Sequence, residues 1–207
     1  MTDSENVAAD LSTAPLAVQV DLASRRVGGR AIATNDDFFA PMANLVSPDP
    51  PQFIPGKYTA RGKWMDGWES RRRRTPGHDW CVVALGIRGI VRTVIVDTTH
   101  FTGNYPSHCS LDALETTKRI PPAVFGATGS PWATILDKQP LAGNSPNLFQ
   151  IGNARPWTHV RLNIFPDGGV ARLRVFGDAV IDWTPAVRER RVVDLAALTN
   201  GGAVLNV

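Results

Sequence analysis

The sequence contains very little cysteine and no long hydrophobic run. Cys81 and Cys109 are the only two cysteines among 207 residues, and both lie in apolar or strand-like surroundings, which indicates reduced thiols rather than a disulfide scaffold. No apolar stretch approaches the ~18 residues that a membrane span needs. The first twenty residues also lack the cationic and then apolar pattern of a secretory signal. The sequence therefore predicts a soluble, cytoplasmic protein with no membrane partner.

Motifs for metals and common cofactors are also absent. The four histidines, His78, His100, His108 and His159, show neither HxH nor HExxH spacing, and the two cysteines are too far apart for a zinc motif. The chain has no phosphate-binding loop, no dinucleotide fingerprint and no Gly-x-Ser-x-Gly elbow. We therefore expect neither a metal nor an organic cofactor.

Helical periodicity is missing between residues 20 and 183, where most of the 18 glycines and 16 prolines separate short apolar segments. Residues 80–85 and 91–97 are expected to form two strands, the second buried on both faces. Residues 158–165 alternate, with Val160, Leu162 and Ile164 on one face and His159, Arg161 and Asn163 on the other. Many short strands at this spacing predict an all-β protein, an antiparallel β-sandwich or jelly roll.

A β-hairpin is expected where the alternating strand ends. Residues 166–169 have turn chemistry, and residues 170–176 return with Leu173 and Val175 opposite Arg172 and Arg174. Asp167 is expected to serve this turn.

An internal repeat sets the domain organisation. Residues 20–29 match residues 193–202 with six identities in ten positions, at an offset of 173 residues. So long a period indicates duplication of a whole domain rather than a solenoid. We therefore expect a flexible tail at residues 1–18, one complete sandwich at 19–183, a linker at 184–190 and the start of a second copy at 191–207.

The most unusual segment spans residues 62–80. It holds three of the six tryptophans, three carboxylates, five cations and one histidine. Four consecutive arginines account for the whole formal excess of +3, so the rest of the chain is nearly neutral and a general nucleic-acid coat protein is excluded. So many costly side chains in one segment favour a binding or catalytic surface.

Each candidate residue in this segment also has a plainer interpretation. Backbone alternation predicts that Arg71 and Arg73 share one face and Arg72 and Arg74 the other, so at most two serve one pocket while the others form a solvated basic edge. Asp66 and Glu69 suit acid or base work, although Glu69 could equally pair with an arginine. A third interpretation is single-stranded nucleic-acid binding, with Trp64 and Trp68 as stacking platforms. The interleaved Asp66, Glu69 and Asp79 oppose it, because they would repel phosphates.

Histidines at two further places could move protons. His78 precedes Asp79, but a surface histidine after Pro-Gly is the commoner outcome. His100, Thr102 and Asn104 follow a predicted buried strand, where loops commonly orient substrates. A turn rich in hydrogen bonds explains these three residues equally well.

At these residues the chain closely resembles the allantoicase family. The resemblance rests on residues 62–80, with Lys63-Trp64-Met65-Asp66-Gly67-Trp68-Glu69-Ser70 followed by four arginines, and on residues 21–24, 37–45, 96–104 and 166–175. It implies two jelly-roll repeats of galactose-binding-like fold, of which the second is mostly missing here. It also implies hydrolysis of allantoate to ureidoglycolate and urea in purine (allantoin) catabolism, and a homo-oligomer at full length.

The resemblance and the chemistry of allantoate suggest a role for each candidate. Asp66, Glu69, His78 and His100 are the expected catalytic acid, base and proton-carrying groups. The expected substrate-binding residues are Lys63, Trp68, Arg71, Arg73, Asp79, Thr102 and Asn104. Of these, Arg71 and Arg73 would bind the carboxylate, and Thr102 and Asn104 the ureido arms. The alternative is a non-catalytic module that binds a small ligand, but the mixture of acid, imidazole and guanidinium groups favours the enzyme.

Overall fold

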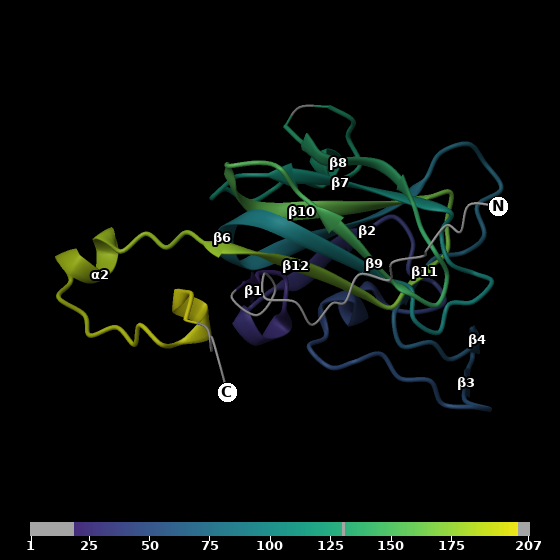
Figure 1. Cartoon of the computed structure of the whole chain (residues 1–207). Helices are drawn as coiled ribbons and strands as arrows, with labels where there is room; N and C mark the ends of the chain where they lie inside the picture. The colour runs from purple at the N-terminus through teal and green to yellow at the C-terminus, as the bar shows by residue number, and fades with distance from the viewer. Residues whose placement is uncertain (1–18, 130, 203–207) are drawn as a thin grey trace, which may run out of the picture.

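The computed structural model describes residues 19–129 and 131–202, whose strands form an antiparallel jelly-roll β-sandwich (Figure 1). The predicted tail at residues 1–18 and the end of the chain at 203–207 lie outside the described residues. The predicted all-β fold is confirmed. Among the described residues, α1 (Pro122–Phe125) and α2 (Thr184–Arg188) are the α-helices, and both are short.

One long strand, β6 (Asp79–Asp97), belongs to both layers of the sandwich. Its first part pairs with β2 (Arg30–Thr34) and β10 (Pro156–Phe165), and its last part pairs with β9 (Pro146–Gln150) and β12 (Arg172–Ala179). Both segments that the sequence predicts as strands are confirmed as strand, but they belong to one continuous strand instead of two. Gly86 and Gly89 lie between the two segments, and they let the neighbouring backbone approach closely instead of opening a loop. A Cβ on Gly86 would lie 2.3 Å from the carbonyl oxygen of Val27.

The other strands complete the two layers or form two small sheets beside them. In the first layer, β7 (His108–Leu114) lies beside β10 and pairs with β8 (Ala133–Pro140), while β1 (Val20–Asp21) pairs with β12 in the second. Two small sheets stand apart: β3 (Tyr58–Thr59) with β4 (Gly62–Lys63), and β5 (Trp68–Glu69) with β11 (Gly169–Val170). The 3-10 helices in the part of the chain that the structure describes are η1 (Arg25–Val27), η2 (Met42–Val46) and η3 (Leu198–Asn200). In Figure 1, α2 and the last described residues extend from one end of the sandwich.

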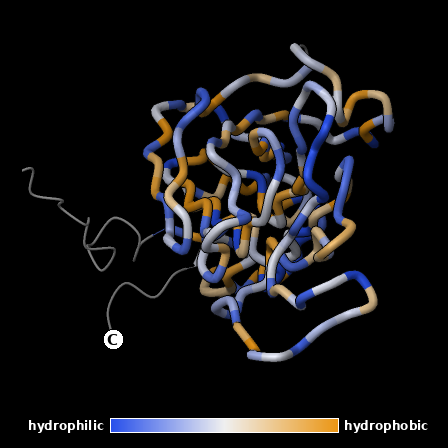
Figure 2. Tube along the Cα trace, turned by 90° about the vertical axis from the view of Figure 1, so that its right-hand side faces the viewer, coloured by the Kyte–Doolittle hydropathy of each residue, from blue (hydrophilic) through white to orange (hydrophobic). Residues whose placement is uncertain are grey.

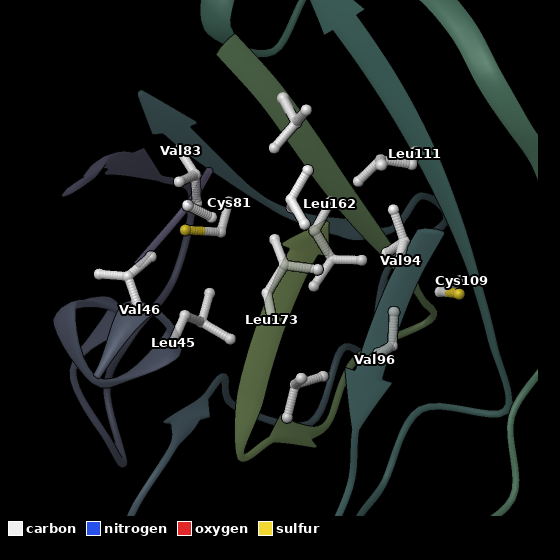
Figure 3. Packing of buried hydrophobic residues seen from close by; sticks show 14 of the residues in the cluster. Leu45, Val46, Cys81, Val83, Val94, Val96, Cys109, Leu111, Leu162 and Leu173 are labelled. Atoms are coloured by element: carbon white, nitrogen blue, oxygen red, sulfur yellow. The ribbon is translucent and has the colours of Figure 1, made fainter. Parts of the chain in front are cut away.

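The core lies between the two layers. Figure 3 shows Cys81 and Val83 from the first part of β6 across from Val94 and Val96 of its last part, with Leu162 and Leu173 between them. All six side chains are fully buried. Figure 2, which views the loop end of the molecule, shows the apolar segments concentrated in the interior. Burial of this continuous apolar surface is the main stabilising contribution to the fold.

The predicted alternation of β10 is confirmed, but its polar face is not solvated. Val160, Leu162 and Ile164 lie in the core, as expected. Arg161 and Asn163 on the opposite face are 5% and 4% exposed. Arg161 donates to carbonyl oxygens in the segment around α1, and Asn163 donates to Ser110 and Asp112 of β7.

The predicted hairpin of residues 158–176 is wrong. β10 and β12 do not pair with each other, because Ile164 lies opposite Asp79 at the start of β6, whereas Arg172 lies opposite Asp97 at its end. Residues 166–171 therefore cross from one layer to the other. Asp167 is not a hairpin-turn residue, since its carboxylate accepts a hydrogen bond from the Arg73 backbone N–H at 2.8 Å.

Candidate active site

The loop end of the sandwich holds Glu69 in a fixed position. Glu69 pairs with Gly169 of β11 on one side and forms a β-bridge with Ala40 on the other. A Cβ on Gly169 would lie 1.9 Å from the ring of Phe101, so only glycine permits this close packing. Trp68, next to Glu69, is fully buried and donates its indole N–H to the carbonyl oxygen of Asp36 at 2.7 Å.

Two adjoining hollows of about 450 and 370 Å³ meet at Glu69. We call them together the Glu69 cleft. Both are lined by Phe39, Glu69, Gly103 and Asn104; the first is also lined by Ser70, Arg72, Tyr105, Ser107, Pro166, Asp167 and Gly168, and the second by Gly62, Lys63, Met65, His100 and Thr102. The residues that line these hollows thus carry acid, imidazole, amide, hydroxyl and cationic groups, a composition suited to a catalytic site.

Glu69 is the carboxylate best placed to carry a proton in this cleft. Burial raises the pKa of Glu69, while the hydrogen bond from Asn104 and the charge of Lys63 oppose that rise less strongly. The amide of Asn104 donates to Glu69 Oε1 at 2.6 Å and fixes its orientation. A raised carboxyl pKa is typical of a general acid that works near neutral pH.

His100 is held by contacts on both its backbone and its ring. Its φ of 71° places a non-glycine residue in the left-handed region, which is uncommon and often found at functional sites. The backbone N–H donates to Asn144 Oδ1 at 2.8 Å, and ring atom Nε2 lies 3.2 Å from the carbonyl oxygen of Pro51. The ring of Phe53 lies 5.8 Å away, centre to centre.

The four arginines do not lie on two separate faces of the chain, as backbone alternation predicts. Arg71 Nε lies 2.6 Å from Asp36 Oδ2, and Arg73 Nη1 lies 2.7 Å from Asp79 Oδ1, so both charges are already matched. All four arginines line a separate hollow of about 410 Å³, and Arg72 also lines the Glu69 cleft. Arg72 makes no ion pair with any residue that the structure describes. The segment takes no sheet partner there, so strict alternation does not apply.

Five of the eleven predicted site residues therefore meet in the Glu69 cleft: Lys63, Glu69, His100, Thr102 and Asn104. The structure places the other six elsewhere. Trp68 is in the core, and Arg71, Arg73 and Asp79 form the ion pairs beside the cleft. The burial of Trp68 also removes one of the two stacking platforms of the nucleic-acid hypothesis.

Asp66 and His78, both predicted to be catalytic, also lie outside the Glu69 cleft. Asp66 pairs with the buried Arg172 at 2.7 Å. The ring of His78 packs on that of Phe165, with ring centres 4.7 Å apart. Burial lowers the pKa of His78, and a hydrogen bond with Asn163 opposes this shift less strongly.

Sequence reasoning missed several residues that line the cleft: Phe39, Arg72, Tyr105, Ser107 and Asp167. They come from four segments that only the fold brings together. The available signal was the family resemblance, because Phe39, Arg72 and Asp167 lie in blocks that carry it, whereas Tyr105 and Ser107 lie just outside them.

The described residues contain no group of three or more His, Cys, Asp or Glu side chains that could hold a metal ion. Burial raises the pKa of Cys109 to about 12 and that of Cys81 further, so neither thiol is an ionised nucleophile at neutral pH. No helix in the described part of the chain has the length and apolar character to cross a membrane.

Fold and cleft together define a galactose-binding-like jelly roll with a polar site at its loop end. The module CBM32-3 of a family 31 glycoside hydrolase from Clostridium perfringens shares this fold, with a TM-score of 0.52 over 78% of this chain and 96% of that chain, at 10% identity. That likeness concerns the fold alone. A family described as "Allantoicase repeat" matches residues 20–180, and the chain therefore belongs to the allantoicase family.

Individual relatives agree with this assignment. A protein named "Probable allantoicase 1" from Burkholderia mallei is 46% identical over 186 residues, which is 90% of this chain and 53% of the relative. The crystal structure of allantoicase from Saccharomyces cerevisiae gives a TM-score of 0.73 at 30% identity, over 88% of this chain and 53% of that one. The chain thus spans about half the length of the relatives that it matches.

Proposed function

We propose that the protein to which this chain belongs hydrolyses allantoate to ureidoglycolate and urea, in the catabolism of purines through allantoin. The family membership supports this reaction. The observation that carries the proposal is Glu69, whose pKa is raised by burial and whose carboxyl faces a cleft with Asn104, His100 and two cations.

The proposed roles follow from the substrate. Allantoate carries a carboxylate and two ureido groups on one carbon. Arg72, which lines the first hollow, binds the carboxylate in place of the ion-paired Arg71 and Arg73. Lys63, which lines the second hollow, contacts another part of the substrate. Thr102 and Asn104 hydrogen-bond the ureido arms.

In the reaction, the C–N bond to one ureido group breaks and a C–O bond to water forms. Glu69 donates a proton to the departing nitrogen, which leaves as urea, and His100 accepts a proton from the attacking water. One water is consumed, and no oxidant or reductant is needed.

Steady-state release of urea from allantoate tests this proposal, measured for the 207-residue chain and for a protein with two full repeats. Glu69→Gln should lower kcat roughly 10²- to 10⁴-fold, as loss of a general acid does. Glu115→Gln, which alters the exposed pair with Arg88, is the matched control and should leave kcat unchanged. The wild-type rate should fall as pH rises through the raised pKa of Glu69, because the acid form is lost.

Binding of allantoate without turnover in both proteins would contradict the enzyme proposal. It would favour the alternative, a non-catalytic β-sandwich module that binds a small ligand.

We also propose the domain limits 1–18, 19–183, 184–190 and 191–207, the last being the start of a second repeat. Support comes from the two matching segments, in which the hydrogen bonds from backbone N–H groups to one aspartate coincide at the offset of 173 residues. Asp21 accepts from the N–H groups of Ala23 and Ser24, and Asp194 accepts from those of Ala196 and Ala197. Both η1 and η3 then end at a glycine with positive φ, 95° at Gly28 and 81° at Gly201.

The same segment supports a proposal about assembly. Leu22 is fully buried in the sandwich, whereas its counterpart Leu195 is 71% exposed, so the described residues leave most of this second side chain uncovered. We propose that a second repeat buries it. We also propose, from the family resemblance, that the full-length protein is a homo-oligomer. A cytoplasmic location is likewise a proposal, supported by two free, buried cysteines.

A further inference from the structure

A buried ion pair joins the start of β12 to Asp66, three residues before Glu69. Arg172, the first residue of β12, has a side chain only 2% exposed, and its Nη2 lies 2.7 Å from Asp66 Oδ2. The same guanidinium donates to the carbonyl oxygens of Asp49 at 2.9 Å and Pro50 at 3.4 Å. A buried ion pair adds little stability over apolar residues of the same size, but it fixes the direction of every group that it hydrogen-bonds.

The groups fixed here belong to residues 49–52, which we call the strap. Asp66 Oδ2 accepts a second hydrogen bond from the backbone N–H of Gln52 at 2.9 Å. The strap is therefore held at both ends, by Arg172 at residues 49 and 50 and by Asp66 at residue 52.

The residue between these two attachments contacts the cleft histidine. The carbonyl oxygen of Pro51 lies 3.2 Å from Nε2 of His100. A carbonyl oxygen can only accept a hydrogen bond, so Nε2 must carry the proton. In the neutral ring, Nδ1 then holds the lone pair and is the atom able to take a proton.

We propose that Asp66 and Arg172 are positioning residues, which hold the strap so that Pro51 keeps His100 in the Nε2–H tautomer with Nδ1 free. The consequence for catalysis rests on the proposed role of His100 as proton acceptor. Asp66 thus acts on the reaction through the strap, without touching the substrate.

The tautomer can be measured directly in the 207-residue chain with ¹⁵N-labelled histidine, using long-range ¹H–¹⁵N spectra at a pH where the ring is neutral. His100→Gln assigns the signal among the four histidines. We expect one tautomer, Nε2–H, in the wild type and a mixture with Nδ1–H in Asp66→Asn. Asp178→Asn is the matched control: it makes the same change in an exposed ion pair with Arg92, at the far end of β12, and should keep the wild-type tautomer.

Arg172→Lys provides a second variant if Asp66→Asn does not fold, because lysine keeps the charge opposite Asp66 but cannot reach all the strap carbonyls. It should also give mixed tautomers. A wild type without a dominant Nε2–H form, or folded variants with an unchanged tautomer, would overturn the proposal. Failure of both variants to fold would also overturn it, because the pair would then be needed for the fold itself.

Turnover of allantoate separates this inference from the proposed function. In a two-repeat protein, Asp66→Asn should lower kcat roughly 10- to 100-fold with little change in KM. The reason is that the proton acceptor His100 is displaced, whereas the protein's contacts with the substrate carboxylate remain. If the wild type shows the expected tautomer but no turnover, only the proposed function fails. If the wild type turns over but the variant keeps both kcat and tautomer, only the positioning role fails.

Discussion

At the scale of single residues, the arginine run shows how neighbours of identical chemistry acquire different uses. Arg71 and Arg73 are ion-paired with Asp36 and Asp79, whereas Arg72 lines the Glu69 cleft with no carboxylate partner among the described residues. A guanidinium that is already paired offers little to an incoming anion. The free guanidinium is the one that can bind a substrate carboxylate.

Arg72→Ala should therefore raise KM for allantoate roughly tenfold or more, as expected from losing a charged hydrogen bond worth about 1.5–3 kcal/mol. The measurement is steady-state urea release as a function of allantoate concentration, in a two-repeat protein. Arg74→Ala is the matched control, because Arg74 is exposed and does not line the cleft. Equal effects of the two substitutions would mean that the run acts only as a diffuse positive surface.

At the scale of elements, β10 makes buried contacts on both of its faces. Its apolar face lies in the core, and on its polar face Arg161 Nη2 lies 2.7 Å from Asp112 Oδ2 of β7. Asn163 donates to the same carboxylate oxygen at 2.8 Å. Arg161 also donates to the carbonyl oxygens of Phe125 and Ala127, so this buried network ties the segment around α1 to the sheet.

Removing the acid from this network should destabilise the fold strongly. Asp112→Ala leaves Arg161 buried without a counter-charge, and we expect the free energy of unfolding to fall by about 3–5 kcal/mol at neutral pH. Urea denaturation measures this loss. The control is Asp178→Ala, which removes an exposed pair and should cost under about 1 kcal/mol.

The stabilisation that Asp112 contributes should also depend on pH. Burial alone would raise the pKa of Asp112, but the hydrogen bonds from Arg161, Asn163 and Thr134 together lower it below its ordinary value of 3.8. The stabilisation is therefore complete above the unfolded-state pKa and is lost as pH falls through the folded-state pKa. The difference between wild type and Asp112→Ala should shrink in that acidic range, and a constant difference would contradict the role given to the ionised carboxylate.

At the scale of the whole molecule, the described chain is one sandwich with a short arm after β12. On that arm Val187, Val192 and Leu195 are all more than 70% exposed. A hollow of about 420 Å³ between the sandwich and the arm is lined by Leu198 of η3 and by residues of β1 and η1. Apolar groups left in water in this way favour association.

The 207-residue chain should therefore self-associate more than a chain of residues 1–185, which lacks these three side chains. Sedimentation velocity at several protein concentrations measures the difference, and circular dichroism checks that both chains keep their β-structure. A protein with two full repeats should not show this concentration-dependent association beyond its own stable oligomer. A monodisperse 207-residue monomer would contradict the prediction.

The sequence predicts where strands lie better than it predicts which strands pair with each other. The alternation of residues 158–165 located β10 correctly, because a period of two is a local property of the backbone. The turn residues at 166–169 were recognised too, but they serve a crossing between layers instead of a hairpin. Turn chemistry reports only that the chain changes direction, and the partner strand is chosen by burial of apolar faces far along the chain.

The sequence by itself determined the all-β class, the internal repeat and the segment that supplies Glu69, because these depend on composition, periodicity and local motifs. Only the tertiary structure decided that Arg72 lines the cleft, that Asp66 holds a strap, and that Trp68 is in the core. Those outcomes depend on which distant groups fill each space and match each charge. Pairing of Arg71 with Asp36 and of Asp66 with Arg172 spans 35 and 106 residues of chain, a separation that no local pattern encodes.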